Sequence, residues 1–419
     1  MLSKLITLMK DEVLLVKGPA TVRVKSGGAS VLGATLKIDH EVLVRKNKVL
    51  PFESNGESSF IVTLGDDGDY SVECGDVGTR IWKEVVDKVF KNDLPKRLIL
   101  IGKTDSGKST LATYLTNIAV SKGLKVGIVD GDVGQNDLGP PGSVGVKVVE
   151  DSIFDLRDLS AERLNFIGVT SPRYKFVENS LMSAIRDLVE SVSKTVDLCI
   201  INTDGYVSEG GVNYKLNLID NVRPDLIIYL KSPEGESELY TKIVERLGAD
   251  RLVVAERSKR FVKNRVERIE RRVRQYHRFL KDGRRIKVNL KSLKLIFLGN
   301  MYSMNANQVK FESSEAFETW KRVGGDGSLI ISQGINEGVI KVYNDCKFVF
   351  INQSSLQGMF VALGVDDCVK GFGIIQRVFP TFDTYILTPM KERFDSVFLS
   401  LISLAPNMTE ESTIPLVFG

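Results

Sequence analysis

A phosphate-binding pattern is the clearest chemical signal in this sequence. One glycine-rich stretch fits G-x-x-x-x-G-K-[ST] at every position, and it consists of Gly102, Lys103, Thr104, Asp105, Ser106, Gly107, Lys108 and Ser109, followed by Thr110. Backbone N–H groups in such a loop surround phosphate oxygens, and the positive end of the following helix adds to the attraction. We expect Lys108 to reach the β- and γ-phosphates of a nucleotide and Ser109 to ligate Mg²⁺.

Two acidic residues follow the next apolar run and provide a second chemical signal. Asp130 and Asp132 come directly after Val126–Val129. Ligands gather at the carboxyl ends of parallel strands, so this loop is expected to face the phosphate loop. Asp132 is a candidate Mg²⁺ ligand or acceptor of a proton from an attacking hydroxyl, a role worth about 10²–10⁴ in rate. The alternative is that Asp130 and Asp132 are only turn or helix-cap residues.

Other residues narrow the class of nucleotide-dependent protein. An amide, Asn202, stands at the end of the apolar run Leu198–Ile201, where a phosphate-loop protein more often has Asp. The run Leu226–Leu230 continues into Lys231 without a guanine-reading Asn-Lys-x-Asp motif, so a GTPase is not supported. Two histidines and four scattered cysteines without Cys-x-x-Cys spacing favour neither a Ser-His-Asp hydrolase nor a zinc site.

The most basic part of the chain lies between Arg257 and Lys287. It contains 14 Lys or Arg residues and three acids, while the whole chain has a net charge of only +4. Apolar residues recur at helical spacing within it and predict one apolar stripe, formed by Val262, Val266, Ile269, Val273, Tyr276 and Leu280. The excess of positive charge favours a lid that faces phosphate over a salt-bridged surface helix, which remains the alternative.

The elements that must position these residues fall into three parts. A chain of 419 residues is expected to form two or three domains. Short β-rich runs with Gly- or Asn-containing breaks predict a small N-terminal all-β sandwich or barrel over residues 1–78. Strands and helices alternate in residues 79–288, which predicts an α/β domain with a mostly parallel sheet. Residues 289–419 return to β-type runs and predict a β-rich C-terminal domain.

Together these residues resemble the polynucleotide 5′-hydroxyl kinases, a family that includes the kinase subunit of the mRNA cleavage factor, nucleolar rRNA-processing kinases and archaeal relatives. The resemblance covers nearly the whole chain and its three-part layout. The family's phosphate loop matches Gly102–Thr110, and its catalytic acidic motif matches Asp132–Gln135. The segment that the family places beneath the substrate matches Thr170–Pro172. Two further family segments, known as the clasp and the lid, match Thr203–Tyr206 and Glu256–Lys259.

The family's residue roles are transferred by this resemblance. It implies that Asp132 accepts a proton and that Arg257 stabilises the transferring phosphate, with Lys108 as the third catalytic residue. Tyr206 stands where the family usually has a Trp that stacks on a nucleobase, and Tyr can also stack. A core role for Tyr206 is the alternative. The other substrate-binding candidates are Gln135, Thr170, Lys259 and Lys263.

One departure from the family pattern bears on the lid. The family has a second lid arginine shortly after Arg257, whereas this sequence has Val262 and Lys263 there. Lys263 or Arg265 could supply the charge, although Lys lacks the bidentate fork of Arg. A catalytically weak, ATP-bound scaffold of an RNA-processing complex is therefore one alternative reading. A P-loop ATPase switch is another.

The sequence thus predicts a kinase that uses ATP and Mg²⁺ to phosphorylate 5′-hydroxyl ends of RNA, and of DNA as a further option. No apolar run approaches the roughly 18–20 residues of a membrane span. Charged residues also interrupt the apolar N-terminus. We therefore expect no membrane attachment and a cytoplasmic location, or a nuclear one in a cell with a nucleus.

Overall fold

The computed structural model describes residues 2–54, 56–75, 77–91, 93–173, 175–208, 210–231, 237–256, 265–297, 300–302, 328–332, 340–343, 348–411 and 416–418. The chain forms two compact units, each built from several segments. The first unit consists of Met1–Asp132, Val146–Glu162 and Ile185–Glu267. The second consists of Val133–Gly145, Arg163–Ala184 and Arg268–Gly419.

The N-terminal part of the first unit is a sandwich of two antiparallel sheets. One has the order β1-β8-β3-β6 and the other β5-β4-β7-β2-β9. Alternate residues of β3 are buried, as the two-residue period of a one-sided strand requires. Side chains from both sheets, such as Leu14, Phe52 and Phe60, form one apolar core. The strands are β1 (Leu2–Leu8), β2 (Glu12–Lys17), β3 (Ala20–Ser26), β4 (Ala29–Val31), β5 (Ala34–Leu36), β6 (Glu41–Val44), β7 (Val49–Ser54), β8 (Ser58–Leu64) and β9 (Asp69–Cys74).

The rest of the first unit is built on parallel strands in the order β11-β14-β10-β15-β16. They are β10 (Arg97–Gly102), β11 (Val126–Gly131), β14 (Leu198–Thr203), β15 (Leu226–Leu230) and β16 (Leu252–Ala255). Every residue of β11, β14 and β15 is buried, as expected of parallel strands that are covered on both faces. Their carboxyl ends meet at one edge of the sheet, where the phosphate loop follows β10.

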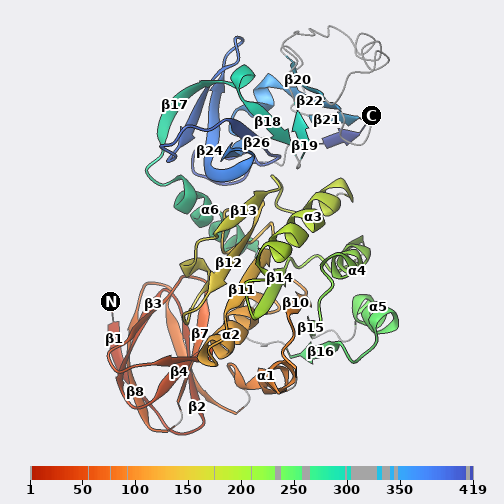
Figure 1. The fold of residues 1–419 in the computed structure, drawn as a ribbon. Helices are drawn as coiled ribbons and strands as arrows, with labels where there is room; N and C mark the ends of the chain where they lie inside the picture. Colours follow the sequence, from red (N-terminus) through yellow and green to blue (C-terminus); the bar gives the residue numbers. More distant parts are fainter. Residues whose placement is uncertain are drawn as a thin grey trace. The chain divides into compact units, whose positions relative to one another are not determined.

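Four helices belong to the first unit: α1 (Lys83–Phe90), α2 (Lys108–Ser121), α4 (Gly210–Val222) and α5 (Glu238–Leu247). Figure 1 shows α2 between the N-terminal strands and the parallel strands. The Asn117 amide on α2 donates to the carbonyl oxygens of Leu32 and Ile153, both over 2.8 Å. The strand β12 (Ser143–Val149), the 3-10 helix η2 (Leu156–Asp158) and the helix α3 (Lys175–Val192) complete this region of the chain.

The second unit contains a seven-stranded sheet, β17-β25-β24-β23-β26-β18-β19, and a four-stranded sheet, β20-β22-β21-β27. The helix α6 (Arg265–Leu280) buries Tyr276 and Leu280 against the phenylalanines of the larger sheet. The remaining elements are β13 (Arg163–Phe166), β17 (Arg284–Asn289), η3 (Leu290–Ser292), β18 (Lys294–Phe297), β19 (Asn300–Tyr302), β20 (Ser328–Ser332), β21 (Ile340–Tyr343), β22 (Phe348–Asn352), η4 (Gln353–Leu356), β23 (Phe360–Val365), β24 (Cys368–Val378), β25 (Asp383–Thr388), β26 (Ser396–Leu399) and β27 (Leu416–Phe418).

The predicted fold class is confirmed: a P-loop α/β core is accompanied by β-rich N-terminal and C-terminal parts. The proposed boundaries at residues 78 and 288 remain predictions. Within the described parts of the chain, none of the helices combines the length and apolar character needed to cross a membrane.

The structure corrects one expectation about the basic segment. Its helix ends at Leu280, the last residue of the predicted apolar stripe, and Arg284, Arg285 and Lys287 belong to strand β17. Val266 was expected in the apolar stripe but is 61% exposed, whereas Tyr276 and Leu280 are buried. The stripe is thus buried only toward the end of α6, where it packs on the C-terminal sheet.

Candidate functional site

The phosphate loop has the backbone conformation that its glycines allow. Gly107 has a φ of 101° and precedes the first residue of α2, so a residue with a Cβ would be strained there. A Cβ on Gly102 would lie 2.9 Å from Ser106 Oγ and 3.0 Å from Leu230. Ser106 Oγ is buried and has no hydrogen-bond partner among the described residues. The strand, loop and helix therefore form the context that the motif requires.

Lys108 is buried and points back over the phosphate loop. Its ammonium group donates to the carbonyl oxygens of Gly102 and Lys103, each over 2.8 Å. Burial lowers the pKa of Lys108 from its ordinary value to about 8, although the negative charge of Asp132 opposes this shift. The positive charge of Lys215 lowers the pKa of Lys108 further. Lys108 and Asp132 are thus close enough to interact electrostatically.

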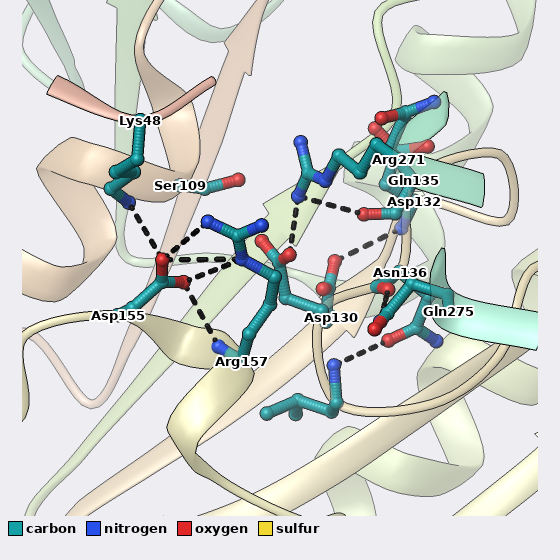
Figure 2. Close-up of polar contacts among 12 residues, drawn as sticks. Lys48, Ser109, Asp130, Asp132, Gln135, Asn136, Asp155, Arg157, Arg271 and Gln275 are labelled. Atoms are coloured by element: carbon teal, nitrogen blue, oxygen red, sulfur yellow. Dashed lines mark hydrogen bonds and ion pairs between the residues drawn. The ribbon is translucent and has the colours of Figure 1, made fainter. Parts of the chain in front are cut away.

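An amide links the hydroxyl of the phosphate loop to the carboxylate at the end of the next strand. Asn202 Nδ2 lies 3.0 Å from Asp130 Oδ1 and 3.3 Å from Ser109 Oγ. Asp130 is fully buried, and its Oδ1 also accepts a hydrogen bond from the backbone N–H of Asp132 over 3.3 Å. Figure 2 shows Ser109, Asp130 and Asp132, with the hydrogen bond between the Asp132 backbone and Asp130 as a dashed line. Asn202 therefore occupies the position that its spacing predicts.

Asp130 combines features of both sequence interpretations. It accepts the N–H of a residue two positions on, which is a turn contact, yet its carboxylate is also connected to Ser109 through the Asn202 amide. Asp132 itself is half-buried at the end of β11. Among the residues that the structure describes, no group of three or more His, Cys, Asp or Glu side chains is arranged to hold a metal.

The absence of such a cluster is compatible with Mg²⁺, since this ion usually takes only one or two carboxylates together with phosphate and water oxygens. Ser109 and the carboxylates of Asp130 and Asp132 provide oxygen donors of the right type. These residues therefore fit a Mg²⁺ ion that arrives with a nucleotide.

The loop after β14 holds the candidate stacking residue. Tyr206 is half-buried, and its backbone N–H donates to Asp204 Oδ1 over 2.8 Å. Its ring stacks on that of Tyr214 with 6.4 Å between centroids and 29° between planes. A Cβ on Gly205 would lie 2.1 Å from Thr104 Oγ1, so this loop touches the phosphate loop directly.

The second unit contains Gln135 and Thr170. Both are half-buried. Gln135 is the first residue of a loop whose backbone carbonyl oxygens accept hydrogen bonds from side chains of α6. Gln275 Nε2 donates to the carbonyl oxygens of Asn136 and Gly139 over 2.9 and 3.2 Å. Arg271 donates to the carbonyl oxygen of Gln135 over 3.4 Å and pairs with Asp137. Figure 2 shows Gln135, Asn136, Arg271 and Gln275 of this network.

These contacts correct the expectation that the basic helix lacks acidic partners. Ion pairs join Arg271 with Asp137, Arg272 with Glu410 over 2.8 Å, and Arg274 with Glu270 over 3.6 Å. The first two acids lie more than 130 residues away in sequence, so a local charge count could not include them. The lid candidates Arg257, Lys259 and Lys263 lie outside the described residues.

Two features around the site were not predicted from the sequence. The first is Trp82, whose ring lies 3.6 Å from the position of a Cβ on Gly107. Its indole N–H donates to the carbonyl oxygen of Glu256 over 2.9 Å. The Asp204–Lys215 ion pair was also missed, although a lysine at an apolar position of α4 is a detectable signal.

A second ionic cluster joins the β sandwich to the rest of the first unit. Asp155 accepts hydrogen bonds from Arg157 and lies 3.8 Å from Lys48 Nζ, as Figure 2 shows. Burial of Asp155 opposes its ionisation, but the charges of Lys48 and Arg157 together with hydrogen bonds from Arg157 hold its pKa well below the usual range. Because Lys48 comes from the sandwich, the cluster fixes that part beside η2.

The fold and this site define a P-loop nucleotide-binding protein. A family model described as "mRNA cleavage and polyadenylation factor CLP1 P-loop" matches residues 102–282.

Curated relatives and a solved structure are similar to a larger part of the chain. The chain is 26% identical over 318 residues to the polyribonucleotide 5′-hydroxyl-kinase of Methanocaldococcus jannaschii, covering 74% of this chain and 86% of that protein. It is 27% identical over 314 residues to the protein of the same name from Pyrococcus horikoshii, covering 73% and 84%. The structure of the wild-type Clp1p–Pcf11p complex aligns with a TM-score of 0.68, 14% identity and coverage of 96% and 98%, so the fold is shared.

Proposed function

We propose that this protein transfers the γ-phosphoryl group of ATP to the 5′-hydroxyl end of RNA, in RNA processing or repair. The observation that carries the proposal is the set of Lys108, Ser109, Asp130, Asp132 and Asn202 at the carboxyl ends of adjacent parallel strands. The names of the archaeal relatives support the reaction and its RNA substrate. DNA ends are a further candidate substrate.

The phosphate loop is proposed to hold the donor nucleotide. Backbone N–H groups from Gly102 to Thr110 would surround its phosphates, and the N-terminus of α2 would add positive potential. Lys108 already lies over the loop, held by two carbonyl oxygens. Phosphate oxygens would take the place of those carbonyls as acceptors, so the ammonium group needs little displacement to neutralise the transferring group.

The transfer itself is a displacement at phosphorus. The 5′-hydroxyl oxygen forms a bond to the γ-phosphorus while the bond from this phosphorus to the β–γ bridging oxygen breaks, and ADP leaves. The hydroxyl proton goes to the carboxylate of Asp132. Lys108 remains protonated and stabilises charge on the phosphoryl oxygens.

Ser109 and Asp132 are proposed to hold Mg²⁺ with the nucleotide. The ion, when bound, neutralises phosphate charge and orients the transferring group. Asn202 keeps the Ser109 hydroxyl and the Asp130 carboxylate in a fixed relation. Because residue 202 is an amide and not a carboxylate, the negatively charged ligands of the ion would come from the loop that contains Asp130 and Asp132.

The polynucleotide is proposed to meet Tyr206 by stacking and Gln135, Thr170, Lys259 and Lys263 by polar contacts. Arg257 is proposed to act on the transferring phosphate. The roles of all these residues except Tyr206 rest on the family resemblance alone. Stacking of a base on an aromatic ring is worth about 1–3 kcal/mol, enough for Tyr206 to contribute measurably to substrate binding.

The direct test uses ATP labelled at the γ-phosphate with a short oligoribonucleotide that has a 5′-hydroxyl. A 5′-phosphorylated oligomer and an oligodeoxyribonucleotide serve as controls for the accepting group and the sugar. Label on 5′-hydroxyl ends alone is the expected result. Label on the ribonucleotide but not the deoxyribonucleotide would establish RNA as the substrate.

Two variants assign the chemistry within the same assay. Asp132→Asn is expected to lower the turnover rate by about 10²–10⁴ while ATP still binds, because the proton acceptor is lost. Lys108→Ala is expected to abolish transfer. Full activity of Asp132→Asn would rule out its role as proton acceptor, and ATP binding by the wild type without transfer would favour the scaffold reading. Hydrolysis that needs no 5′-hydroxyl end would favour the ATPase switch.

A further inference from the structure

A fully buried ion pair lies beneath the candidate stacking residue. Lys215 Nζ on α4 donates to Asp204 Oδ2 over 2.9 Å, and the side chain of Lys215 is completely buried. The Tyr214 hydroxyl donates to the same carboxylate oxygen over 3.0 Å. The other oxygen, Oδ1, accepts the backbone N–H of Tyr206. The Asp204 carboxylate thus accepts hydrogen bonds both from its own loop and from helix α4.

Stability alone does not account for such a pair. Removal of two charges from water costs about as much as their attraction returns, and apolar residues of similar volume often stabilise a protein as well or better. Buried ion pairs do, however, fix one arrangement of the groups around them, because any shift leaves a charge or donor without its partner. The geometry around Asp204 therefore decides what this pair contributes.

That geometry connects three parts of the candidate site. The hydrogen bond from Tyr206 N–H fixes the backbone that carries the Tyr206 ring, and the ring itself stacks on Tyr214. Lys215 Nζ lies 4.7 Å from the centroid of the Tyr214 ring, so the same lysine holds the base of the stack. The intervening Gly205 packs against Thr104 of the phosphate loop. Displacement of the turn would therefore move Tyr206 relative to the bound nucleotide.

We propose that Asp204 and Lys215 are positioning residues that hold Tyr206 in place against the phosphate loop for the nucleobase at the 5′ end. This inference rests on the proposed function, since it needs a polynucleotide that stacks on Tyr206. It assigns neither residue a contact with the substrate. The pair acts on substrate binding through the position of one aromatic ring.

The test variant is Asp204→Leu/Lys215→Met, which replaces both charges with apolar side chains of similar size. It leaves no unpaired buried charge, so the protein is expected to fold with a similar thermal midpoint. The two lost charges act on Lys108 in opposite directions, so ATP affinity is expected to stay within about twofold. KM for a 5′-hydroxyl oligoribonucleotide is expected to rise about tenfold, as loss of a stacking contact would produce.

A second variant restores the key acceptor. Asp204→Asn/Lys215→Met also lacks both charges but keeps an oxygen for the Tyr206 N–H, and it is expected to recover most of the wild-type KM. A third variant combines Tyr206→Ala with the Leu/Met pair. Its KM is expected to equal that of Tyr206→Ala alone, because both changes remove the same stacking contact with the nucleobase. Replacement of the exposed Glu238–Lys242 ion pair of α5 by Gln and Met is the matched control and should leave KM unchanged.

Hydrogen exchange at the Tyr206 amide provides a readout that does not depend on activity. Faster exchange is expected in the Leu/Met variant and near-wild-type exchange in the Asn/Met variant. Unchanged exchange and unchanged KM in the Leu/Met variant, with or without a lower thermal midpoint, would overturn the proposal. If the wild type transfers no label to 5′-hydroxyl ends, the proposed function fails, whereas the exchange at Tyr206 still decides whether the ion pair positions this loop.

Discussion

The side-chain amide of Asn202 lies 3.0 Å from the carboxylate of Asp130 at the carboxyl ends of neighbouring strands. Both side chains are almost completely buried. The amide is thus a neutral donor at a position where a carboxylate would meet another carboxylate. An amide is favoured at position 202 because it does not place a second negative charge beside Asp130. The Asn202 amide also donates a hydrogen bond to Ser109 Oγ.

Asn202→Asp is therefore expected to make folding stability depend strongly on pH. Two buried carboxylates at this distance cannot both ionise, so the pKa of one rises above its unfolded value. The folded variant then holds a proton that the unfolded chain releases, and stability falls as pH rises. We expect the free energy of unfolding to match that of the wild type at about pH 4, near the unfolded pKa of Asp, and to be about 3 kcal/mol lower at about pH 8.

Mg²⁺ with ATP is expected to restore much of that loss, since a bound cation neutralises the added charge. Thermal unfolding of wild type and variant across this pH range, with and without Mg²⁺ and ATP, measures both effects. A gap between the two proteins that does not change with pH would contradict the assignment of Asn202 and Asp130 as close neighbours.

ATP affinity of the wild type is expected to decrease as pH rises above about 8. Burial is the largest cause that lowers the pKa of Lys108 to about 8, so its ammonium group loses its proton in this range. Only the charged form attracts phosphate, so affinity is expected to fall about tenfold for each further pH unit. Calorimetric titration with ATP at a series of pH values measures this, and Lys108→Met, which has no such proton, should bind weakly without the same inflection.

Folding stability should respond to the same group with the opposite sign. Between the folded pKa of about 8 and the ordinary value of 10.5, the unfolded chain retains a proton that folded Lys108 has lost. The contribution of Lys108 to stability therefore rises with pH in this range, while ATP affinity falls. An ATP affinity that stays constant up to about pH 9.5 would show that Lys108 stays protonated over this range.

The sequence predicted those parts of the site that depend on neighbouring residues. The phosphate loop was recognisable because its glycines, lysine and serine stand at fixed spacing between a strand and a helix. Asn202 was placed correctly because β14 has a clear apolar run before it. The contacts of Asn202 with Ser109 and Asp130 were not predictable, because they depend on strand order, which brings together residues 93 and 72 positions apart.

The ionic partners of buried charges were predictable least of all. The run of arginines in α6 suggested a free basic surface, but Asp137 and Glu410 approach it only in the folded chain. Lys215 similarly interrupts an apolar helix face, and nothing near it in sequence identifies Asp204 as its partner more than any other acid. Such contacts depend on tertiary packing, which composition and periodicity do not describe.

Gly205→Ala is expected to weaken ATP binding although residue 205 contacts no nucleotide in the proposed mechanism. The added Cβ would lie 2.1 Å from Thr104 Oγ1 and 2.4 Å from its backbone nitrogen. The phosphate loop backbone must then shift, because rotation of the Thr104 side chain removes only one of the two clashes. Overpacking of this kind costs about 1–3 kcal/mol. We therefore expect ATP affinity to fall about tenfold.

Titration with ATP and thermal unfolding measure the two consequences of Gly205→Ala. Gly28→Ala is the matched control, since nothing lies within 4 Å of a Cβ at that position. It should leave ATP affinity unchanged. Wild-type ATP affinity in Gly205→Ala would mean that the loop after β14 and the phosphate loop move independently.

Two arginines of α6 should differ sharply in their contribution to stability. Arg271 and Asp137 expose only 12% and 3% of their side chains, whereas Arg274 and Glu270 expose 41% and 43%. Arg271→Met leaves Asp137 buried without its arginine, which is expected to cost about 3 kcal/mol or more. Arg274→Met removes a solvent-screened pair within one helix, so it is expected to cost about 0.5 kcal/mol or less.

Urea unfolding followed by the fluorescence of the protein measures the two midpoints under the same conditions. The salt dependence gives a second distinction, because added salt screens the exposed Arg274–Glu270 pair far more than the buried one. Equal, small effects of the two substitutions would mean that α6 behaves as the solvated basic surface that its charge alone suggests. A large effect of Arg271→Met alone would establish that this helix holds the Gln135 loop, because Arg271 also donates to the carbonyl oxygen of Gln135.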